Sequence, residues 1–205
     1  MSIFNRPKTK YEKQLAAEGY QVIAGVDEVG RGCWAGPLVA GAVVMPLSPR
    51  IQGVDDSKQL SKKQREHVAQ KIVQRALCYG IGIVPHDELD RIGITAANEL
   101  AMTRAIAALT HQPDYVLIDA FDMHRLPMKH KSIAHGDATV YSIAAASIIA
   151  KVYRDKLMDE YDVLYPLYGF ATNKGYGTSE HNAAIGKHGV SPIHRMSFQP
   201  MKTMV

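Results

Sequence analysis

Residues 22–45 read VIAGVDEVGRGCWAGPLVAGAVVM, and the rest of the chain is interpreted outward from this segment. It opens with a short apolar run rich in β-branched residues, which predicts a buried strand. The run ends at two adjacent carboxylates, Asp27 and Glu28, and burying like charges side by side is costly unless a cation or hydrogen-bond donors compensate. A Gly-Arg-Gly turn at 30–32 follows, and a second apolar run at 38–45 predicts another strand.

Three interpretations of this acidic pair are open. The first is a structural hairpin whose acids pair with Arg31 or face solvent. The second is a dinucleotide-binding loop, which we set aside because Gly30, Gly32 and Gly36 give the spacing G-x-G-x-x-x-G, and a strand is predicted where that motif requires a helix. The third is a divalent-metal site of hard carboxylate oxygens, which requires at least one more acid from elsewhere in the chain.

Length and composition predict one globular domain spanning 1–205, with a C-terminal helical part at about 160–205. The apolar fraction of 46% and the charged fraction of 21% are typical of globular proteins. No apolar run approaches the roughly 20 residues of a membrane span, and the first residues lack a signal peptide's apolar core. We therefore expect a cytoplasmic protein without membrane contact, in which Cys33 and Cys78 stay reduced.

The net charge of +4 is compatible with a polyanionic partner without being diagnostic. Basic residues recur along the chain at Lys58, Lys62, Lys63, Arg65, Lys129, Lys131, Lys151, Arg154 and Lys174. Solvated surfaces explain any one of them. A basic surface around an acidic centre, however, is typical of a metal-dependent enzyme acting on nucleic acid.

Periodicity predicts alternating strands and helices beyond the opening segment. Ser61 and Gln64 have the spacing of a capping box, which marks a helix start. Further strands are predicted over 79–84, 115–119 and 131–134, and helices over 61–77, 94–109, 139–160 and from 178 or 179 to near 189.

Two further aspartates are candidates for the missing acid. Asp119 closes the strand predicted at 115–119, and parallel α/β sheets gather functional groups at the carboxyl ends of their strands. Asp137 precedes a long helix, where aspartate is a preferred N-cap. The cap is the favoured interpretation of Asp137 from local sequence, although such a residue can also point into a cleft.

A glycine-, aromatic- and lysine-rich segment at 168–178 has two open interpretations. Aromatic faces stack on sugars and bases while lysine contacts phosphate, which suits a nucleic-acid groove. A compact loop with packed aromatic side chains fits equally well. His181, His188 and His194 lack a zinc-site spacing and are interpreted as surface or structural residues.

Taken together, the chain resembles bacterial ribonuclease HII in six segments that occur in that family's order. They span nearly the whole chain: IAGVDEVGRG at 23–32, DDSKQLS at 55–61, LIDA at 117–120, GDATVYSIAAASIIAKVYRD at 136–155, YGFATNKGYGT at 168–178 and HRMSF at 194–198.

The resemblance implies an α/β ribonuclease H-like fold: a mixed five-stranded sheet with its first three strands antiparallel, flanked by helices and followed by a C-terminal helical extension. It implies an endonuclease that hydrolyses the RNA strand of RNA–DNA hybrids. It also implies incision 5′ of ribonucleotides embedded in duplex DNA, leaving 3′-OH and 5′-phosphate ends. The implied cofactors are divalent ions, Mn²⁺ or Mg²⁺, with a pair of them in each site.

The resemblance also implies site residues. By motif, the family's four acidic residues, catalytic and metal-binding, correspond to Asp27, Glu28, Asp119 and Asp137. The expected substrate contacts are the sensing turn Gly30, Arg31 and Gly32, the phosphate contact Lys58 and the junction-reading Tyr176.

Departures from the family pattern occur at His135, where lysine is common, and at Ala120, where glycine is common. The residues after Phe198 do not show the Q-x-x-L-x-x-F-F pattern of sliding-clamp ligands, so no clamp partner is expected. The expected partners are RNA–DNA hybrid and ribonucleotide-containing duplex DNA, bound by a monomer.

Two rival functions stay open from sequence. One is a different nuclease of the same fold, such as a resolvase-like enzyme that cuts branched DNA. The other is a non-catalytic module that binds hybrids. The set of acids argues against this module, because carboxylates at its centre would repel phosphate.

Overall fold

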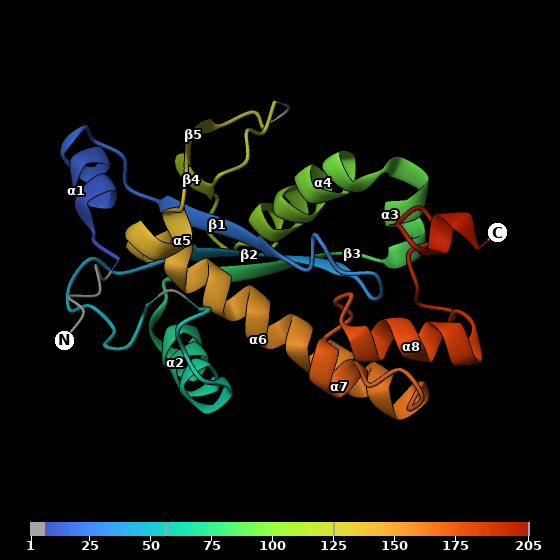
Figure 1. Ribbon diagram of the computed structural model, residues 1–205. Coiled ribbons are helices and arrows are strands. Elements are labelled where there is room, and N and C mark those ends of the chain that lie inside the picture. The colour runs from blue at the N-terminus through green and yellow to red at the C-terminus, as the bar shows by residue number, and fades with distance from the viewer. Residues whose placement is uncertain (1–6, 56, 125, 205) are drawn as a thin grey trace.

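Five strands form one mixed sheet in the computed structural model, which describes residues 7–55, 57–124 and 126–204 (Figure 1). Their spatial order is β3-β2-β1-β4-β5. Their bounds are β1 Ile23–Val29, β2 Leu38–Val44, β3 Cys78–Val84, β4 Tyr115–Asp119 and β5 Lys129–Ile133. The first three strands pair antiparallel, while β4 pairs parallel to both β1 and β5. The predicted sheet, including its antiparallel first three strands, is confirmed.

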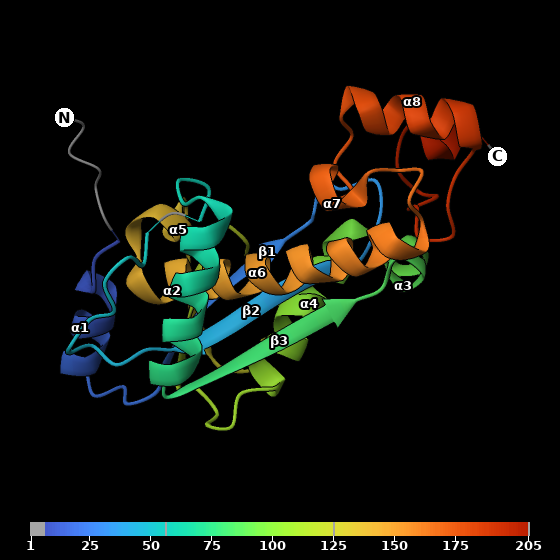
Figure 2. The same cartoon turned by 90° about the horizontal axis from the view of Figure 1, so that it is seen from below.

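Helices cover both faces of this sheet (Figures 1 and 2). Their bounds are α1 Lys10–Ala17, α2 Lys62–Arg75, α3 His86–Ile92, α4 Ile94–Ala107, α5 Gly136–Thr139, α6 Tyr141–Leu164, α7 Phe170–Asn173 and α8 Ser179–His188, followed by the 3₁₀ turn η1 Met201–Thr203. Helix α4 lies on one face, and α6 with α2 lies on the other. The predicted helices therefore form where expected, with ends shifted by a few residues.

The long helix α6 approaches the sheet very closely, and this approach positions one side of the site. A Cβ placed on Gly25 of β1 would lie 2.1 Å from the carbonyl carbon of Ser142 at the start of α6. Only glycine leaves room for backbone to pack against backbone in this way. Ser147, Lys151 and Arg154 follow along α6 at helical spacing, so they share one face of the helix.

Helix α2 begins where the capping box predicts. The Ser61 side chain accepts from the Gln64 amide, and the Gln64 side chain accepts from the Ser61 amide at 2.9 Å. This reciprocal cap satisfies two otherwise orphaned donors. The fixed start of α2 carries Arg65 in its first turn, next to the 57–60 segment whose carbonyls it binds.

Strand β1 is longer than predicted. The acids were expected just beyond its end, but Asp27 pairs with Gly41 and Glu28 with Ala40 in the β1–β2 ladder. Backbone pairing does not require apolar side chains, so the strand continues through Asp27 and Glu28 to Val29. Because side chains alternate along a strand, the two acids point to opposite faces of the sheet.

The aromatic segment at 168–178 combines both of its open interpretations. It contains the short helix α7, and Tyr168 and Phe170 stack at 5.5 Å inside a buried C-terminal cluster. Tyr176, in contrast, is 40% exposed. The first two aromatic residues therefore belong to the core, and the third is available to a ligand.

Among the described residues, none of the helices has the length and apolar character needed to cross a membrane. The C-terminal cluster that includes Met158 of α6, Ile185 of α8 and Met201 of η1 packs beside the sheet's end. A single domain spanning the chain stays a prediction.

We expect Gly25→Ala to lower the free energy of unfolding by about 3 kcal/mol or more, because the new methyl group meets rigid backbone of α6. Urea denaturation followed by circular dichroism measures this change. The control is Gly186→Ala in α8, where an added Cβ meets nothing within 4 Å and helix propensity should raise stability by about 0.5–1 kcal/mol. Equal stability of wild type and Gly25→Ala would contradict this packing argument.

Candidate active site

One pocket of about 270 Å³ is lined by every site residue that the sequence predicted. These residues are Asp27, Glu28, Gly30, Arg31, Gly32, Lys58, Asp119, Asp137 and Tyr176. The pocket is also lined by four polar residues to which the sequence interpretation gave no site role: Ser57, Arg65, Ser147 and Lys151. Ser57 lies in the DSK motif, and Arg65 and Lys151 are among the basic residues named from the sequence. Neither pattern shows which of these side chains face the pocket.

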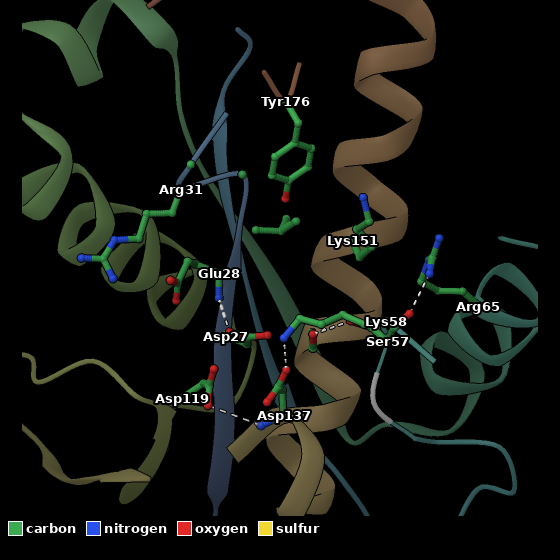
Figure 3. A pocket seen from close by; sticks show the side chains of 14 residues that line it. Asp27, Glu28, Arg31, Ser57, Lys58, Arg65, Asp119, Asp137, Lys151 and Tyr176 are labelled. Atoms are coloured by element: carbon green, nitrogen blue, oxygen red, sulfur yellow. Dashed lines mark hydrogen bonds and ion pairs between the residues drawn. The ribbon is translucent and has the colours of Figure 1, made fainter. Parts of the chain in front are cut away.

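Strand register brings the first two aspartates together (Figure 3). The parallel ladder pairs Val26 with Ile118, so Asp27 and Asp119 are the next residues on neighbouring strands. Register partners in parallel strands share a face, and that face is the one covered by α6. Glu28 points to the opposite side, toward α4, while its amide donates to the Asp27 carboxylate at 2.8 Å.

Asp119 is held by the start of the short helix α5. Its Oδ1 accepts from the Gly136 amide at 2.6 Å and from the Asp137 amide at 3.4 Å. A carboxylate at a helix N-terminus satisfies free amides and interacts favourably with the helix dipole. Ala120, which follows Asp119, adopts φ 41°, in the left-handed region that glycine tolerates best.

Asp137 does not act as the predicted N-cap. It lies inside the first turn of α5, whose N-cap is His135, and α6 begins after Val140. The capping carboxylate comes from Asp119 on β4 instead, a tertiary contact that local sequence does not reveal. Asp137 is therefore released to line the pocket, where it is only 4% exposed.

The ammonium group of Lys58 forms an ion pair with one of the four acids, Asp137. Its Nζ is 2.7 Å from Asp137 Oδ2, and its side chain is 77% exposed while that of Asp137 is 6% exposed. The ammonium group supplies one positive charge to a site with four carboxylates, and Figure 3 shows it reaching Asp137 beside Asp27. A long exposed side chain can change its direction at low cost, so this pairing does not prevent Lys58 from contacting a substrate.

Three of the four carboxyl groups, those of Asp27, Glu28 and Asp119, have raised pKa values. Burial raises the pKa of Asp27 well above its usual value, and the charges of Glu28 and Asp119 raise it further. Burial also raises the pKa of Glu28, although the positive charge of Arg31 opposes this. For Asp119, burial and then the charge of Asp137 raise the pKa. Such a group of acids is stabilised by any cation that enters.

The donor set fits a hard divalent cation by its chemistry, since all four candidate ligands are carboxylates. In the part of the chain that the structure describes, however, no three His, Cys, Asp or Glu side chains already form a group that could hold a metal ion. Two of the four carboxylates have other partners, since Asp119 binds amides of α5 and Asp137 binds Lys58.

A network of ion pairs joins α2 and α6 beside the acids. Lys151 Nζ lies 2.6 Å from Asp155 Oδ1, and Arg65 lies 3.7 Å from the other oxygen of the same carboxylate. Asp159 pairs with Lys62 at 3.0 Å and also with Lys174. These pairs hold a basic rim next to the acidic centre, and Arg65 and Lys151 of this rim line the pocket.

Two buried arginines hold the Gly-Arg-Gly turn and the Tyr176 segment together. Arg154 donates to the carbonyls of Ala35, Pro37 and Lys174 at 2.8–3.1 Å. Arg195 Nη1 donates to the Arg31 carbonyl at 3.1 Å. Both guanidinium side chains are fully buried.

Gly30 has φ 88°, and a Cβ there would lie 2.2 Å from Arg154 Nε, so only glycine fits at this point of the turn.

Comparison with known proteins gives one consistent result. The family model described as Ribonuclease HII matches residues 24–201. The ribonuclease HII of Listeria monocytogenes serovar 1/2a is 50% identical over 194 residues, which cover 95% of this chain and 74% of that protein. The crystal structure of ribonuclease H2 from Pyrococcus horikoshii OT3 is similar with a TM-score of 0.76 at 26% identity, covering 90% of this chain and 97% of that one.

Two more distant structures share the fold. The RNase HII in a PCNA complex from Archaeoglobus fulgidus is 24% identical, with a TM-score of 0.73, and the match covers 87% of this chain and 96% of that one. Bst-RNase HIII in complex with Mn²⁺ is 22% identical, with a TM-score of 0.67, and the match covers 92% of this chain and 71% of that one. The family resemblance and the fold class inferred from the sequence are confirmed.

We expect Asp27→Asn to raise the free energy of unfolding at pH 8 by on the order of 1–2 kcal/mol, because it removes a buried charge from an acidic cluster. The sign of its pH dependence follows from the raised pKa. Below the unfolded-state pKa of the carboxyl, near 4, Asp27 is protonated in both states and the two proteins should be about equally stable. As the pH rises through the raised folded-state pKa, wild type loses the contribution of Asp27, while the losses that come from Glu28 and Asp119 occur in both proteins.

Urea denaturation of both proteins between pH 4 and pH 8 measures this difference. Divalent ions should raise the melting temperature of wild type more than that of the variant, since a ligand that binds the native state stabilises it. A stability difference that is constant with pH would contradict the electrostatic explanation.

Proposed function

The chain belongs to the ribonuclease HII family, and from this premise we propose that it incises duplex DNA 5′ of embedded ribonucleotides, as well as cutting RNA in RNA–DNA hybrids. The family is one of metal-dependent nucleases, so ribonuclease H activity follows from membership. One observation carries the finer proposal: the four acids, the Gly-Arg-Gly turn and Tyr176 line the same pocket. We propose that the products carry 3′-OH and 5′-phosphate ends, and that the enzyme acts as a cytoplasmic monomer.

We propose that Asp27, Glu28, Asp119 and Asp137 hold two divalent ions, Mn²⁺ or Mg²⁺. Such ions, when bound, activate water and neutralise the charge that develops on phosphorus and on the leaving oxygen. Asp27 and Asp119 are adjacent on neighbouring strands and are suited to serve both ions. Glu28 and Asp137, on opposite sides of them, are suited to one ion each.

The basic side chains are proposed to bind the phosphate backbone. Lys58 and Lys151 border the acids, and Arg31 follows them in the turn. Their charges offset the repulsion between a phosphodiester and the carboxylates, and an arginine fork can bind two phosphate oxygens at once. Lys58 would then exchange its contact with Asp137 for one with phosphate as the substrate and ions enter.

Recognition of the ribose requires a group that senses its 2′-OH. The proposal assigns this to backbone amides and carbonyls of the turn at 30–32. Gly32 has open space around the position of a Cβ, so a sugar can approach the backbone there. The turn itself is held from behind by Arg154 and Arg195, which keeps its polar groups pointing one way.

Tyr176 is proposed to stack on the deoxyribose that follows the ribonucleotide, selecting an RNA-to-DNA junction. Burial raises the pKa of its hydroxyl to about 12, so the phenol is neutral and does not repel phosphate at ordinary pH. Its ring lies 6.0 Å from Lys151 Nζ, between the turn and the basic rim.

A gel assay on end-labelled duplexes tests the proposed function. One duplex contains a single ribonucleotide, one is a continuous RNA–DNA hybrid and one is all DNA, each with Mn²⁺, Mg²⁺ or a chelator. We expect cuts 5′ of the ribonucleotide and within the hybrid only when an ion is present. Cleavage of the all-DNA duplex, which has no 2′-OH, would favour a resolvase-like nuclease, and tight binding of the hybrid without turnover would favour a non-catalytic module.

We expect Asp27→Asn to lower cleavage at least about 10³-fold, because a neutral amide cannot replace a charged metal ligand at the centre of the site. Hybrid binding measured by fluorescence anisotropy should survive. The matched control is Asp87→Asn, which removes an exposed carboxylate in the first turn of α3 and should leave cleavage unchanged. Wild-type cleavage by Asp27→Asn would rule out its assigned role.

Tyr176→Ala should lose roughly tenfold or more in kcat/KM on the single-ribonucleotide duplex, since aromatic stacking contributes about 1–3 kcal/mol. Its loss on continuous hybrid should be smaller, because a junction is not required there. Tyr153→Ala on α6, a tyrosine of similar exposure outside the pocket, is the control. An unchanged ratio between the two substrates would refute junction reading by Tyr176.

A further inference from the structure

Two histidines that the sequence interpretation left without a site role form a buried pair behind Tyr176. His181 in α8 and His194, which opens the HRMSF segment, are 0% and 1% exposed. Their Nε2 atoms are 3.0 Å apart, inside the cluster formed by α7, α8 and the end of α6. Of the two interpretations made from sequence, the structural one applies to this pair.

The surrounding backbone determines which nitrogen of each ring carries the proton. The Ser191 amide, which can only donate, points at His194 Nδ1 from 2.8 Å, and the Ser191 hydroxyl, which can donate, lies at the same distance. The Ser191 carbonyl, which can only accept, is farther away at 3.3 Å, so we assign that nitrogen as unprotonated. The Tyr176 carbonyl, which can only accept, lies 2.8 Å from His181 Nδ1, so that nitrogen is protonated. His194 therefore donates through Nε2–H to the lone pair on His181 Nε2.

The result is a hydrogen-bond chain with one direction: Ser191 amide to His194, His194 to His181, and His181 to the Tyr176 carbonyl. It requires both rings to be neutral. Burial lowers the pKa of His181, and burial together with neighbouring His181 lowers the pKa of His194 to about 4. Both rings are therefore neutral at the pH values at which a nuclease would be assayed.

This hydrogen-bond chain ends on the backbone of Tyr176, the residue proposed to read the RNA-to-DNA junction. The Tyr176 carbonyl accepts from both His181 and the Thr178 amide, and the Tyr176 amide donates to the Asn173 carbonyl. The next residue, Gly177, packs so tightly that a Cβ would lie 2.2 Å from the Trp34 ring. The backbone on either side of the Tyr176 Cα is thus fixed, which limits the directions its ring can take.

The other end of the pair contacts the segment that follows the Gly-Arg-Gly turn. His194 forms a β-bridge with Ala35, and the amide of Arg195 donates to the Trp34 carbonyl at 2.8 Å. The Arg195 guanidinium reaches the Arg31 carbonyl. The segment at 194–195 therefore connects residues 31–35 with the Tyr176 segment.

We propose that His181 and His194 are positioning residues for substrate selection: this neutral pair sets the Tyr176 backbone relative to the Gly-Arg-Gly turn and so controls the preference for a single ribonucleotide. Neither ring lines the pocket, and the pair acts through Tyr176. The inference rests on the junction-reading role proposed for Tyr176.

Two substitutions of one residue separate positioning from packing. His181→Asn keeps an N–H donor near the position of Nδ1, where it can reach the Tyr176 carbonyl. His181→Leu keeps apolar volume and removes the donor. The readout is the ratio of kcat/KM on a single-ribonucleotide duplex to kcat/KM on continuous hybrid. We expect His181→Leu to lower this ratio about three- to tenfold, the effect of one net hydrogen bond, and His181→Asn to stay close to wild type.

A double variant tests whether the effect passes through Tyr176. In a Tyr176→Ala background, His181→Leu should change the ratio no further. Should His181→Leu fail to fold, long-range ¹H–¹⁵N spectra of the wild-type imidazoles keep the inference testable. They must show protonated Nδ1 in His181 and protonated Nε2 in His194, and any other tautomers overturn it.

The remaining outcomes are distinct. An unchanged ratio in Tyr176→Ala overturns junction reading and this inference with it. A shifted ratio in Tyr176→Ala with an unchanged ratio in folded His181→Leu overturns the inference alone. Equal losses in His181→Asn and His181→Leu also overturn it, because they would show that the hydrogen-bond donor has no part in the effect and that the pair acts through packing alone.

Discussion

Mutual repulsion among four carboxylates in one pocket is the constraint on which the rest of this structure depends. Like charges this close disfavour ionisation, and burial raises the pKa of Asp27, Glu28 and Asp119. The fold compensates incompletely, with the ammonium of Lys58 and with the amides of α5 that bind Asp119. The incomplete compensation has a use. A site whose charges were fully satisfied by the protein would gain little from a cation, whereas this one is stabilised when a cation enters.

The sheet supplies the rigidity that holds such a cluster together. Asp27 and Asp119 are far apart in sequence but are adjacent in the parallel β1–β4 ladder, so backbone hydrogen bonds oppose their separation. Glu28 is kept nearby yet on the opposite face by the alternation of the same strand. Helix α6 closes the pocket because Gly25 lets it pack directly on β1, which brings Ser147 and Lys151 to the acids. Local geometry thus converts a scattered set of residues into one site.

Much of this arrangement could be predicted from the sequence, and the failures have physical causes. Asp119 was found because a strand-end acid is a local signal with a general meaning in parallel sheets. Asp137 was misread as a cap because local preference favours aspartate before a helix, while the capping carboxylate is that of Asp119, seventeen residues before Gly136, whose amide it binds. The end of β1 was placed too early because the polar side chains of Asp27 and Glu28 were taken to mark the end of the strand. Backbone pairing with β2 in fact continues through both residues. The contact between His181 and His194 follows from tertiary packing, which their spacing does not encode.

The half of the pocket formed by the Gly-Arg-Gly turn and Tyr176 depends on a different interaction, the binding of backbone carbonyls by buried guanidinium groups. Arg154 and Arg195 reach the segments around the Gly-Arg-Gly turn and before Tyr176, which have no ladder of their own to hold them. A lysine could not replace either residue, because several carbonyls in fixed directions require a planar fork of donors. Arg154 also lies on α6, the helix that packs on β1, so it ties the Gly-Arg-Gly turn to the sheet that carries the acids. Under the proposed function this tie is what sets the turn relative to the acids, since a displacement of about 1 Å between a bound substrate and the groups that act on it is enough to lose most of the rate.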